Sequence, residues 1–234
     1  MIFETHAHYD DERFDEDRDI LIEKLFQKNI CNIINVGASI ESTKTTIALA
    51  KKYENMYAAA GVHPSDIAGL NEETLAWLKE QTKDPKVIAV GEIGLDFCKP
   101  IDRTLQLQRL TEQAALAEKR RLPIVLHCVK AYEKLLSLMD QYAVPILFHG
   151  FTGSPQLACQ LIRKGYFLSF GTTLFRSPRT QEALRTTPYE HLFLETDEAD
   201  TTIEEIYRQA AALRNTPIET LKHSIYTNYK TLFG

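Results

Sequence analysis

Five of the seven histidines follow short apolar segments of the chain, at the positions where strands would end. His6 and His8 follow the first such segment, and His63, His127 and His149 follow three later ones. A spacing of two residues directs the side chains of His6 and His8 to the same face of a strand. Any one of these histidines could be a buried structural residue. Five of them at strand ends indicate shared chemistry.

Two carboxylates occur at equivalent positions. Glu92 follows the apolar segment 87–90, and Asp197 follows the segment 192–196. A carboxylate at the end of a buried strand is costly unless it is solvated, paired or bound to a metal. Imidazole together with carboxylate suits transition metals such as Zn and Mn. We therefore expect one or two divalent metal ions, with Glu92 placed to bridge two ions ~3.5 to 4 Å apart.

The elements that must position these residues alternate between two patterns. Apolar, β-branched runs predict strands at 1–5, 31–36, 56–62, 87–90, 123–126, 145–148, 166–170 and 192–196. Apolar spacing of three to four predicts helices at 19–27, 42–53, 72–79, 104–119, 131–142 and 155–163. Continuous apolar runs are typical of parallel strands buried on both faces. The sequence predicts an α/β, single-domain (β/α)8 barrel with its active site at the C-terminal strand ends. A doubly wound open sheet is the alternative.

Composition excludes several classes of protein. The formal net charge of −5 argues against a globally basic nucleic-acid binder. No apolar run approaches the ~20 residues needed to span a bilayer, and no signal-like segment opens the chain. We expect a cytoplasmic protein without an obligate protein partner. No linker or repeat interrupts the chain, which predicts one domain over residues 1–234. The four cysteines form no CxxC pair, so we interpret them as reduced thiols.

Short motifs along the chain carry a resemblance to a known family. They are residues 3–10 (FETHAHYD), 35–37 (NVG), 61–64 (GVHP), 91–96 (GEIGLD), 122–127 (LPIVLH), 149–154 (HGFTGS), 194–197 (LETD) and 228–234 (NYKTLFG). In this order they resemble the TatD-type metal-dependent deoxyribonucleases and hydrolases of the metal-dependent hydrolase superfamily. The resemblance covers nearly the whole chain.

The resemblance implies a ligand set and an activity. One metal ion would be held by His6, His8, Glu92 and Asp197, and a second by Glu92, His127 and His149. Glu92 and Asp197 would be the catalytic residues, with Asp197 accepting the proton of the nucleophilic water. The family hydrolyses phosphodiester bonds in DNA, often from a 3′ end, with Mg or a transition metal. The implied function is a DNase or 3′ exonuclease, and the implied partner is DNA or a small phosphate ester.

Substrate contacts are less well defined. His63 is not among the usual metal ligands of the family, so a contact with substrate phosphate or a supporting role is expected, with simple packing as the alternative. The turn at 150–154 precedes a helix whose free backbone N–H groups could bind phosphate, although Ser154 could equally be an ordinary N-cap. The other expected contacts are Lys130, Phe151 and Ser154, with Phe175 and Arg176 as further candidates by position.

The chain departs from the family pattern at two places. Val129 occupies a position where relatives commonly carry Arg, and Lys130 next to it is only a point charge. The usual Ala-Pro-aromatic-Leu segment and the following loop are missing, so residues 198–200 lead directly into a helix that starts near Thr201 or Thr202.

Without this loop, the wall of the substrate site after Asp197 is expected to be shorter. We expect the metal ligands to stay in place, because they come from strand ends, and the range of substrates that can enter to change. Glu198 and Asp200 add negative charge near the site and would repel a polyanion. DNA hydrolysis should therefore be slower than in relatives with the full loop. Equal rates on one oligonucleotide at matched metal and salt concentrations would contradict this expectation.

Two other functions remain open from the sequence. An amidohydrolase acting on C–N or ester bonds uses a related barrel, but many such enzymes bridge two metals with a modified lysine after the fourth strand. This chain has Glu92 there, which favours phosphoester chemistry. A non-catalytic binding scaffold would be expected to have lost metal ligands, yet all six are present.

Overall fold

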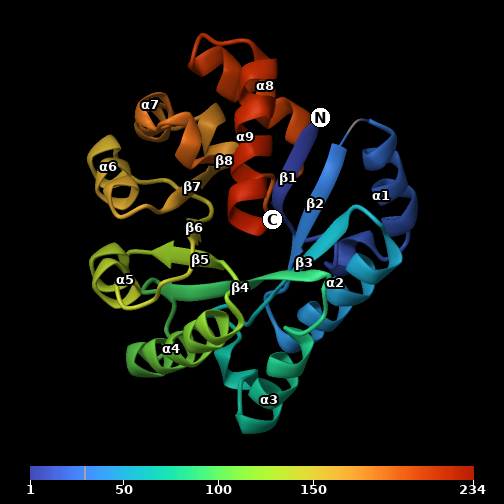
Figure 1. The fold of residues 1–234 in the computed structure, drawn as a ribbon, viewed down its shortest axis with the longest axis vertical. Helices are drawn as coiled ribbons and strands as arrows, with labels where there is room; N and C mark the ends of the chain where they lie inside the picture. The colour runs from blue at the N-terminus through green and yellow to red at the C-terminus, as the bar shows by residue number, and fades with distance from the viewer. Residues whose placement is uncertain (29) are drawn as a thin grey trace. The chain divides into compact units, whose positions relative to one another are not determined.

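The structure is a computed structural model that describes residues 1–28 and 30–234. Its eight parallel strands follow one another in the sheet in chain order, from β1 to β8, and helices lie between them along the chain (Figure 1). This is the (β/α)8 class that the sequence predicts. The strands are β1 (Ile2–Ala7), β2 (Ile30–Val36), β3 (Met56–Ala60), β4 (Val87–Asp96), β5 (Ile124–Val129), β6 (Ile146–Phe148), β7 (Phe167–Phe170) and β8 (Leu192–Leu194).

The α-helices are α1 (Arg18–Gln27), α2 (Ile40–Lys52), α3 (Glu72–Gln81), α4 (Arg103–Arg120), α5 (Tyr132–Met139), α6 (Pro155–Arg163), α7 (Pro178–Thr186), α8 (Ile203–Leu213) and α9 (Ile218–Phe233). The described residues also form the short 3₁₀ helices η1 (Glu12–Phe14), η2 (Ile67–Gly69), η3 (Thr172–Phe175) and η4 (Tyr189–His191). No helix in the described part of the chain is long and apolar enough to cross a membrane.

The chain forms two compact units, residues 1–34 with 148–234 and residues 35–147. In the first unit β1 lies beside β8: Ala7 pairs with Asp197 in a parallel bridge, and Thr5 Oγ1 donates to the Leu194 carbonyl at 2.7 Å. Helices α8 and α9 pack on β1 (Figure 1). The first and last strands are therefore neighbours, as a barrel requires.

In the second unit β3, β4 and β5 pair in parallel. Strand β4 continues to Asp96, beyond the predicted end at residue 90, because its glycines interrupt the apolar run without ending the strand. Gly94 pairs with His127 of β5 and has a φ of 155°. A Cβ at Gly94 would lie 2.0 Å from the His127 carbonyl oxygen, so only glycine permits this close approach.

Buried side-chain amides also fix strand ends in the second unit. Gln113 of α4 accepts from the Val62 N–H at 2.8 Å and donates to the Val62 carbonyl at 3.1 Å. Its fully buried amide takes the place of the backbone hydrogen-bond partners that a neighbouring strand would supply, because Val62 lies beyond the end of β3. His63 follows directly, so this contact positions a candidate site residue. The prediction that residues 1–234 form a single domain stays a prediction.

Substitution of Tyr207 tests the packing of α8 on β1. Its phenol is buried, donates to the Phe3 carbonyl at 3.1 Å and accepts from the Phe3 N–H at 3.3 Å. Tyr207→Phe removes both bonds from a buried backbone, so we expect the free energy of unfolding to fall by ~1 to 3 kcal/mol in urea denaturation.

Tyr226→Phe is the matched control, because the Tyr226 ring also packs on Phe3, at 5.4 Å between centroids, and is partly exposed. It should change the free energy of unfolding by less than ~0.5 kcal/mol. An equal loss in the two variants would show that the phenol of Tyr207 adds nothing beyond its ring.

Candidate metal centre

In the unit of residues 1–34 and 148–234, the ends of three strands bring two imidazoles and a carboxylate together. One ligand atom from each of His6, His149 and Glu195 lies within 4.8 Å of the other two. The rings of His6 and His149 are stacked with centroids 4.1 Å apart, and His149 Nδ1 lies 3.6 Å from Glu195 Oε1. All three side chains are buried. This donor set matches the imidazole and carboxylate ligands of transition metals.

The Glu195 carboxyl group provides a direct test of whether a cation fits. The side chain is fully buried, and Oε1 accepts from the Gly150 N–H at 2.6 Å. Oε2 has no hydrogen-bond partner among the described residues. An unsatisfied buried acceptor costs ~1 to 3 kcal/mol, and more when it is charged. A divalent cation beside the two imidazoles would remove that cost, so the residues present fit a metal ion.

Asp197 brings a second carboxylate to the same unit. Its Oδ1 lies 3.4 Å from His8 Nε2 and 3.7 Å from His6 Nε2, and the two Nε2 atoms are 3.1 Å apart. Asp197 has a left-handed backbone, with φ of 57°, and its N–H donates to the His6 carbonyl at 2.9 Å. Its side chain is 42% exposed, in contrast to the buried Glu195. Of Glu195 and Asp197, Asp197 is therefore the one whose carboxylate solvent can reach.

In the unit of residues 35–147, His63, Glu92 and His127 form a separate group. Glu92 Oε1 lies 2.6 Å from His127 Nδ1 and 3.5 Å from His63 Nε2. The rings of His63 and His127 meet edge to face, with centroids 4.3 Å apart. Asp96 Oδ2 lies 3.8 Å from His127 Nε2. Glu92 is 4% exposed, so its charge must be balanced by these neighbours or by a cation.

The hydrogen bonds of His63 distinguish it from the other imidazoles. Its Nδ1 accepts from the Ser65 N–H at 3.0 Å. A neutral imidazole carries one ring proton, so the proton of His63 is assigned to Nε2, which faces Glu92 Oε1. In this tautomer the Nε2–H of His63 faces Glu92 Oε1, 3.5 Å away. The supporting role expected for His63 stays a prediction.

Glu4 holds the backbone next to the group formed by His6, His149 and Glu195. Its Oε1 accepts from the N–H groups of Thr196 at 3.1 Å and His6 at 3.4 Å, and its Oε2 accepts from Thr196 Oγ1 at 2.9 Å. Burial raises the pKa of Glu4 to about 8. Glu4 thus ties the end of β1 to the segment that follows β8, where Glu195 and Asp197 lie.

Sequence reasoning missed Glu195, Asp96 and Glu4. The signal was available for two of them, because residues two apart on a strand point to the same face. Glu195 precedes Asp197 by two residues, and Glu4 precedes His6 by two. Asp96 was assigned no role because β4 was predicted to end before it.

The expected substrate contacts have different environments. Phe151 is fully buried and meets Phe170 edge to face at 5.6 Å, so its ring packs in the interior. Ser154 is the N-cap of α6, and its side chain accepts from the Leu157 N–H at 3.3 Å. Lys130 follows β5 with a φ of 52° and is exposed. In this conformation Lys130 is exposed and Ser154 half-buried, whereas Phe151 is closed to a ligand.

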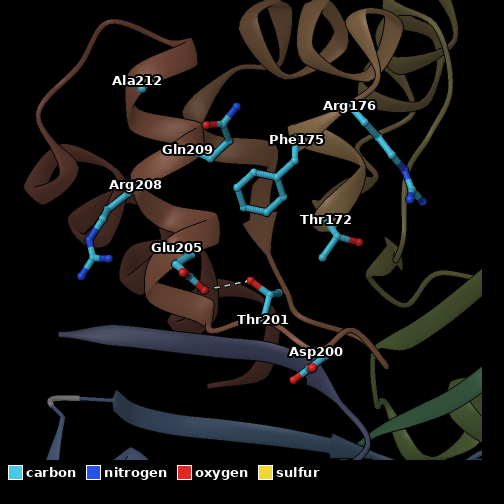
Figure 2. A pocket seen from close by; sticks show the side chains of 9 residues that line it. All are labelled: Thr172, Phe175, Arg176, Asp200, Thr201, Glu205, Arg208, Gln209 and Ala212. Carbon is cyan, nitrogen blue, oxygen red and sulfur yellow. Dashed lines mark hydrogen bonds between the residues drawn. The ribbon is translucent and has the colours of Figure 1, made fainter.

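Phe175 and Arg176 line a hollow of about 710 Å³ beside α8 (Figure 2). The Phe175 ring points into this hollow and is 47% exposed. Arg176 and Arg208 project to opposite sides of it, and Glu205 is hydrogen-bonded to Thr201 at its floor. Phe175 is therefore accessible, whereas the two guanidinium groups do not converge on one point.

Comparison with known proteins gives a consistent picture. A family model described as TatD related DNase matches residues 3–234. The uncharacterized metal-dependent hydrolase YabD of Bacillus subtilis is 33% identical over 203 residues, which cover 84% of this chain and 80% of the relative. The 3′-5′ ssDNA/RNA exonuclease TatD of Cronobacter sakazakii is 32% identical over 203 residues, covering 84% of this chain and 77% of the relative.

A solved structure supports the fold assignment. The crystal structure of YjjV, a TatD homolog from Escherichia coli K12, matches with a TM-score of 0.89 and 29% sequence identity. The match covers 99% of this chain and 97% of that chain. The (β/α)8 prediction is therefore confirmed both by strand order and by this similarity.

Metal addition tests the candidate centre. A ligand that binds only the folded state at 100 times its Kd stabilises it by ~2.7 kcal/mol, which is a rise in Tm of ~5 to 10 °C for a chain of this size. We expect Mn²⁺ or Zn²⁺ to produce such a rise in thermal denaturation and EDTA to reverse it. Glu195→Gln should weaken the affinity for the metal at least ~10-fold, because it removes one unit of negative charge from the ligands.

Glu23→Gln is the matched control, since Glu23 lies exposed on α1. It should respond to metal as the wild type does. A metal response that Glu195→Gln leaves intact would exclude Glu195 from the centre.

Proposed function

This chain belongs to the TatD related DNase family, and from that membership we propose that it hydrolyses phosphodiester bonds of single-stranded nucleic acid with one or two divalent metal ions. It is a metal-dependent hydrolase acting on ester bonds. The DNase or 3′ exonuclease activity, and the choice among Mg, Mn and Zn, are parts of the proposal. The name of the Cronobacter sakazakii relative, a 3′-5′ ssDNA/RNA exonuclease, supports the class of substrate.

The observation that carries this proposal is the chemistry of the strand ends. Each unit has its own group of imidazoles and carboxylates: His6, His149 and Glu195 in one, and Glu92, His63 and His127 in the other. In a (β/α)8 barrel the active site is built at the C-terminal ends of the strands. We propose a single domain over residues 1–234, with His6, His8, Glu92, His127, His149 and Asp197 as metal ligands and Glu195 as a further ligand beside His6 and His149.

When bound, divalent ions lower the pKa of water to near neutrality and offset the negative charge of the attacked phosphoryl group. Asp197 is the residue suited to accept the proton of that water, because its carboxylate is half exposed while its backbone is held by the His6 carbonyl. A general base must reach its proton within hydrogen-bonding distance. The fixed backbone and reachable oxygens of Asp197 meet this requirement.

Glu92 and His63 have a joint role in the other group. Glu92 is buried and presents Oε1 to two imidazoles, so the proton on His63 Nε2 faces its carboxylate and would orient it. Glu92 would hold a metal ion through this carboxylate. His63 is thus a positioning residue, and no covalent intermediate on a Ser or Cys is needed.

Hydrolysis of a labelled oligonucleotide tests the proposed function. We expect a 5′-labelled single-stranded DNA to be shortened from its 3′ end with Mg²⁺, Mn²⁺ or Zn²⁺ and not with EDTA. Asp197→Asn should retain the fold and lose at least ~100-fold in kcat, the lower range for removal of a general base, since an amide does not accept the proton.

Glu92→Ala in the same assay should lose activity with all three metals, while Glu23→Gln retains it. Hydrolysis of only a small chromogenic phosphodiester would redirect the proposal to small esters. Undiminished kcat in Asp197→Asn would remove its assignment as the base.

A further inference from the structure

A hollow of about 640 Å³ adjoins two of the proposed metal ligands in the unit of residues 1–34 and 148–234. His8 and Asp197 lie on its wall. The remainder comes from the β1–α1 connection and α1 on one side and from residues 196–205 on the other. Its volume lies within the ~300 to 1,000 Å³ of small-molecule sites. We call this hollow the base pocket.

Flat and apolar side chains line one wall of the base pocket. Tyr9 and Phe14 contribute rings whose centroids are 5.8 Å apart, at an interplanar angle of 48°. Leu21 and Leu25 are four residues apart on α1, so they share one face of the helix. Ile203, the first residue of α8, adds an apolar side chain from the opposite side. Such a wall suits a planar, uncharged group.

The charged residues of the base pocket exclude a phosphate from it. A single arginine, Arg13, stands against the carboxylates of Asp17, Asp197, Asp200 and Glu205. These carboxylates repel an anion but accept hydrogen bonds from amino and ring N–H groups. The charge pattern therefore fits the heterocyclic base of a nucleotide and not its phosphate.

Arg13 is already engaged and does not offset this acidity at the centre of the pocket. Its Nη1 donates to the Glu198 carbonyl at 2.7 Å, and its guanidinium lies 4.5 Å from the centroid of the Phe14 ring. The bond to Glu198 joins the two sides of the pocket, and the contact with Phe14 orients the guanidinium within its own side. The pocket is thus a built feature, fixed by a bond between segments that are 185 residues apart.

We propose that the base pocket holds the base of the nucleotide whose phosphate lies at the metal centre. This inference rests on the proposed function and extends it, because it assigns the specificity for nucleic acid to Tyr9, Phe14, Leu21 and Leu25. The phosphate stays with the metal ligands His8 and Asp197, and the uncharged base enters the apolar part of the hollow.

Equilibrium binding tests the base pocket without turnover. In calorimetry with Mn²⁺ present, 2′-deoxyadenosine 5′-monophosphate should bind at least ~10-fold more tightly than 2-deoxyribose 5-phosphate, as expected for stacking of one base. Leu21→Trp fills the pocket and should remove this difference. Leu25→Phe is a second variant that adds less volume, and thermal denaturation checks that both fold.

Ile20→Trp is the matched control, because Ile20 precedes Leu21 on α1, is 56% exposed and does not line the pocket. It should keep the preference for the nucleotide. Equal binding of the two ligands to the wild type, or a preference that Leu21→Trp leaves intact, would overturn the base pocket.

A hydrolysis experiment separates this inference from the proposed function. Wild type should cleave an oligonucleotide with an intact 3′-terminal nucleotide with a KM at least ~10-fold lower than one whose terminal nucleotide lacks its base, and Leu21→Trp should abolish the ratio. Cleavage of both at equal KM overturns the base pocket and leaves the proposed function standing. Cleavage of neither overturns the proposed function and the base pocket with it.

Discussion

The buried carboxylate of Glu195 is the constraint on which the candidate centre depends. One of its oxygens is satisfied by the Gly150 N–H, and the other has no hydrogen-bond partner among the described residues. Buried polar groups are almost always hydrogen-bonded or otherwise compensated, and a bound cation would compensate this one. The stacked rings of His6 and His149 lie beside this carboxylate, so three strand ends bring together the donors that a divalent cation needs.

A second constraint acts through the backbone of the other unit. Gly94 permits β4 and β5 to approach so closely that any side chain at this position would collide with the His127 carbonyl. That approach sets the register in which Glu92 meets His127 at 2.6 Å. A glycine that carries no chemistry therefore determines the contact between two residues that do.

The sequence was sufficient to predict the fold and much of the candidate site, because both depend on local pattern. Apolar runs alternate with helical spacing, and the charged or imidazole side chains follow the runs. It was insufficient where tertiary contacts decide. Gly91 and Gly94 interrupt the apolar run, so the sequence does not indicate that β4 continues to Asp96. The burial of Phe151 against Phe170 is a tertiary contact that its position in a loop does not predict. The tautomer of His63 depends on the N–H of Ser65, a contact that only the folded chain shows.

The bond between Arg13 and the Glu198 carbonyl has a consequence for how this protein can change. It joins the connection that contributes Tyr9 and Phe14 to the segment that contributes Asp197. A substitution that widened the hollow by releasing this bond would also free the backbone beside Asp197. Substrate range and turnover are thus coupled through this bond. A variant that accepts bulkier substrates by this route should have a lower kcat.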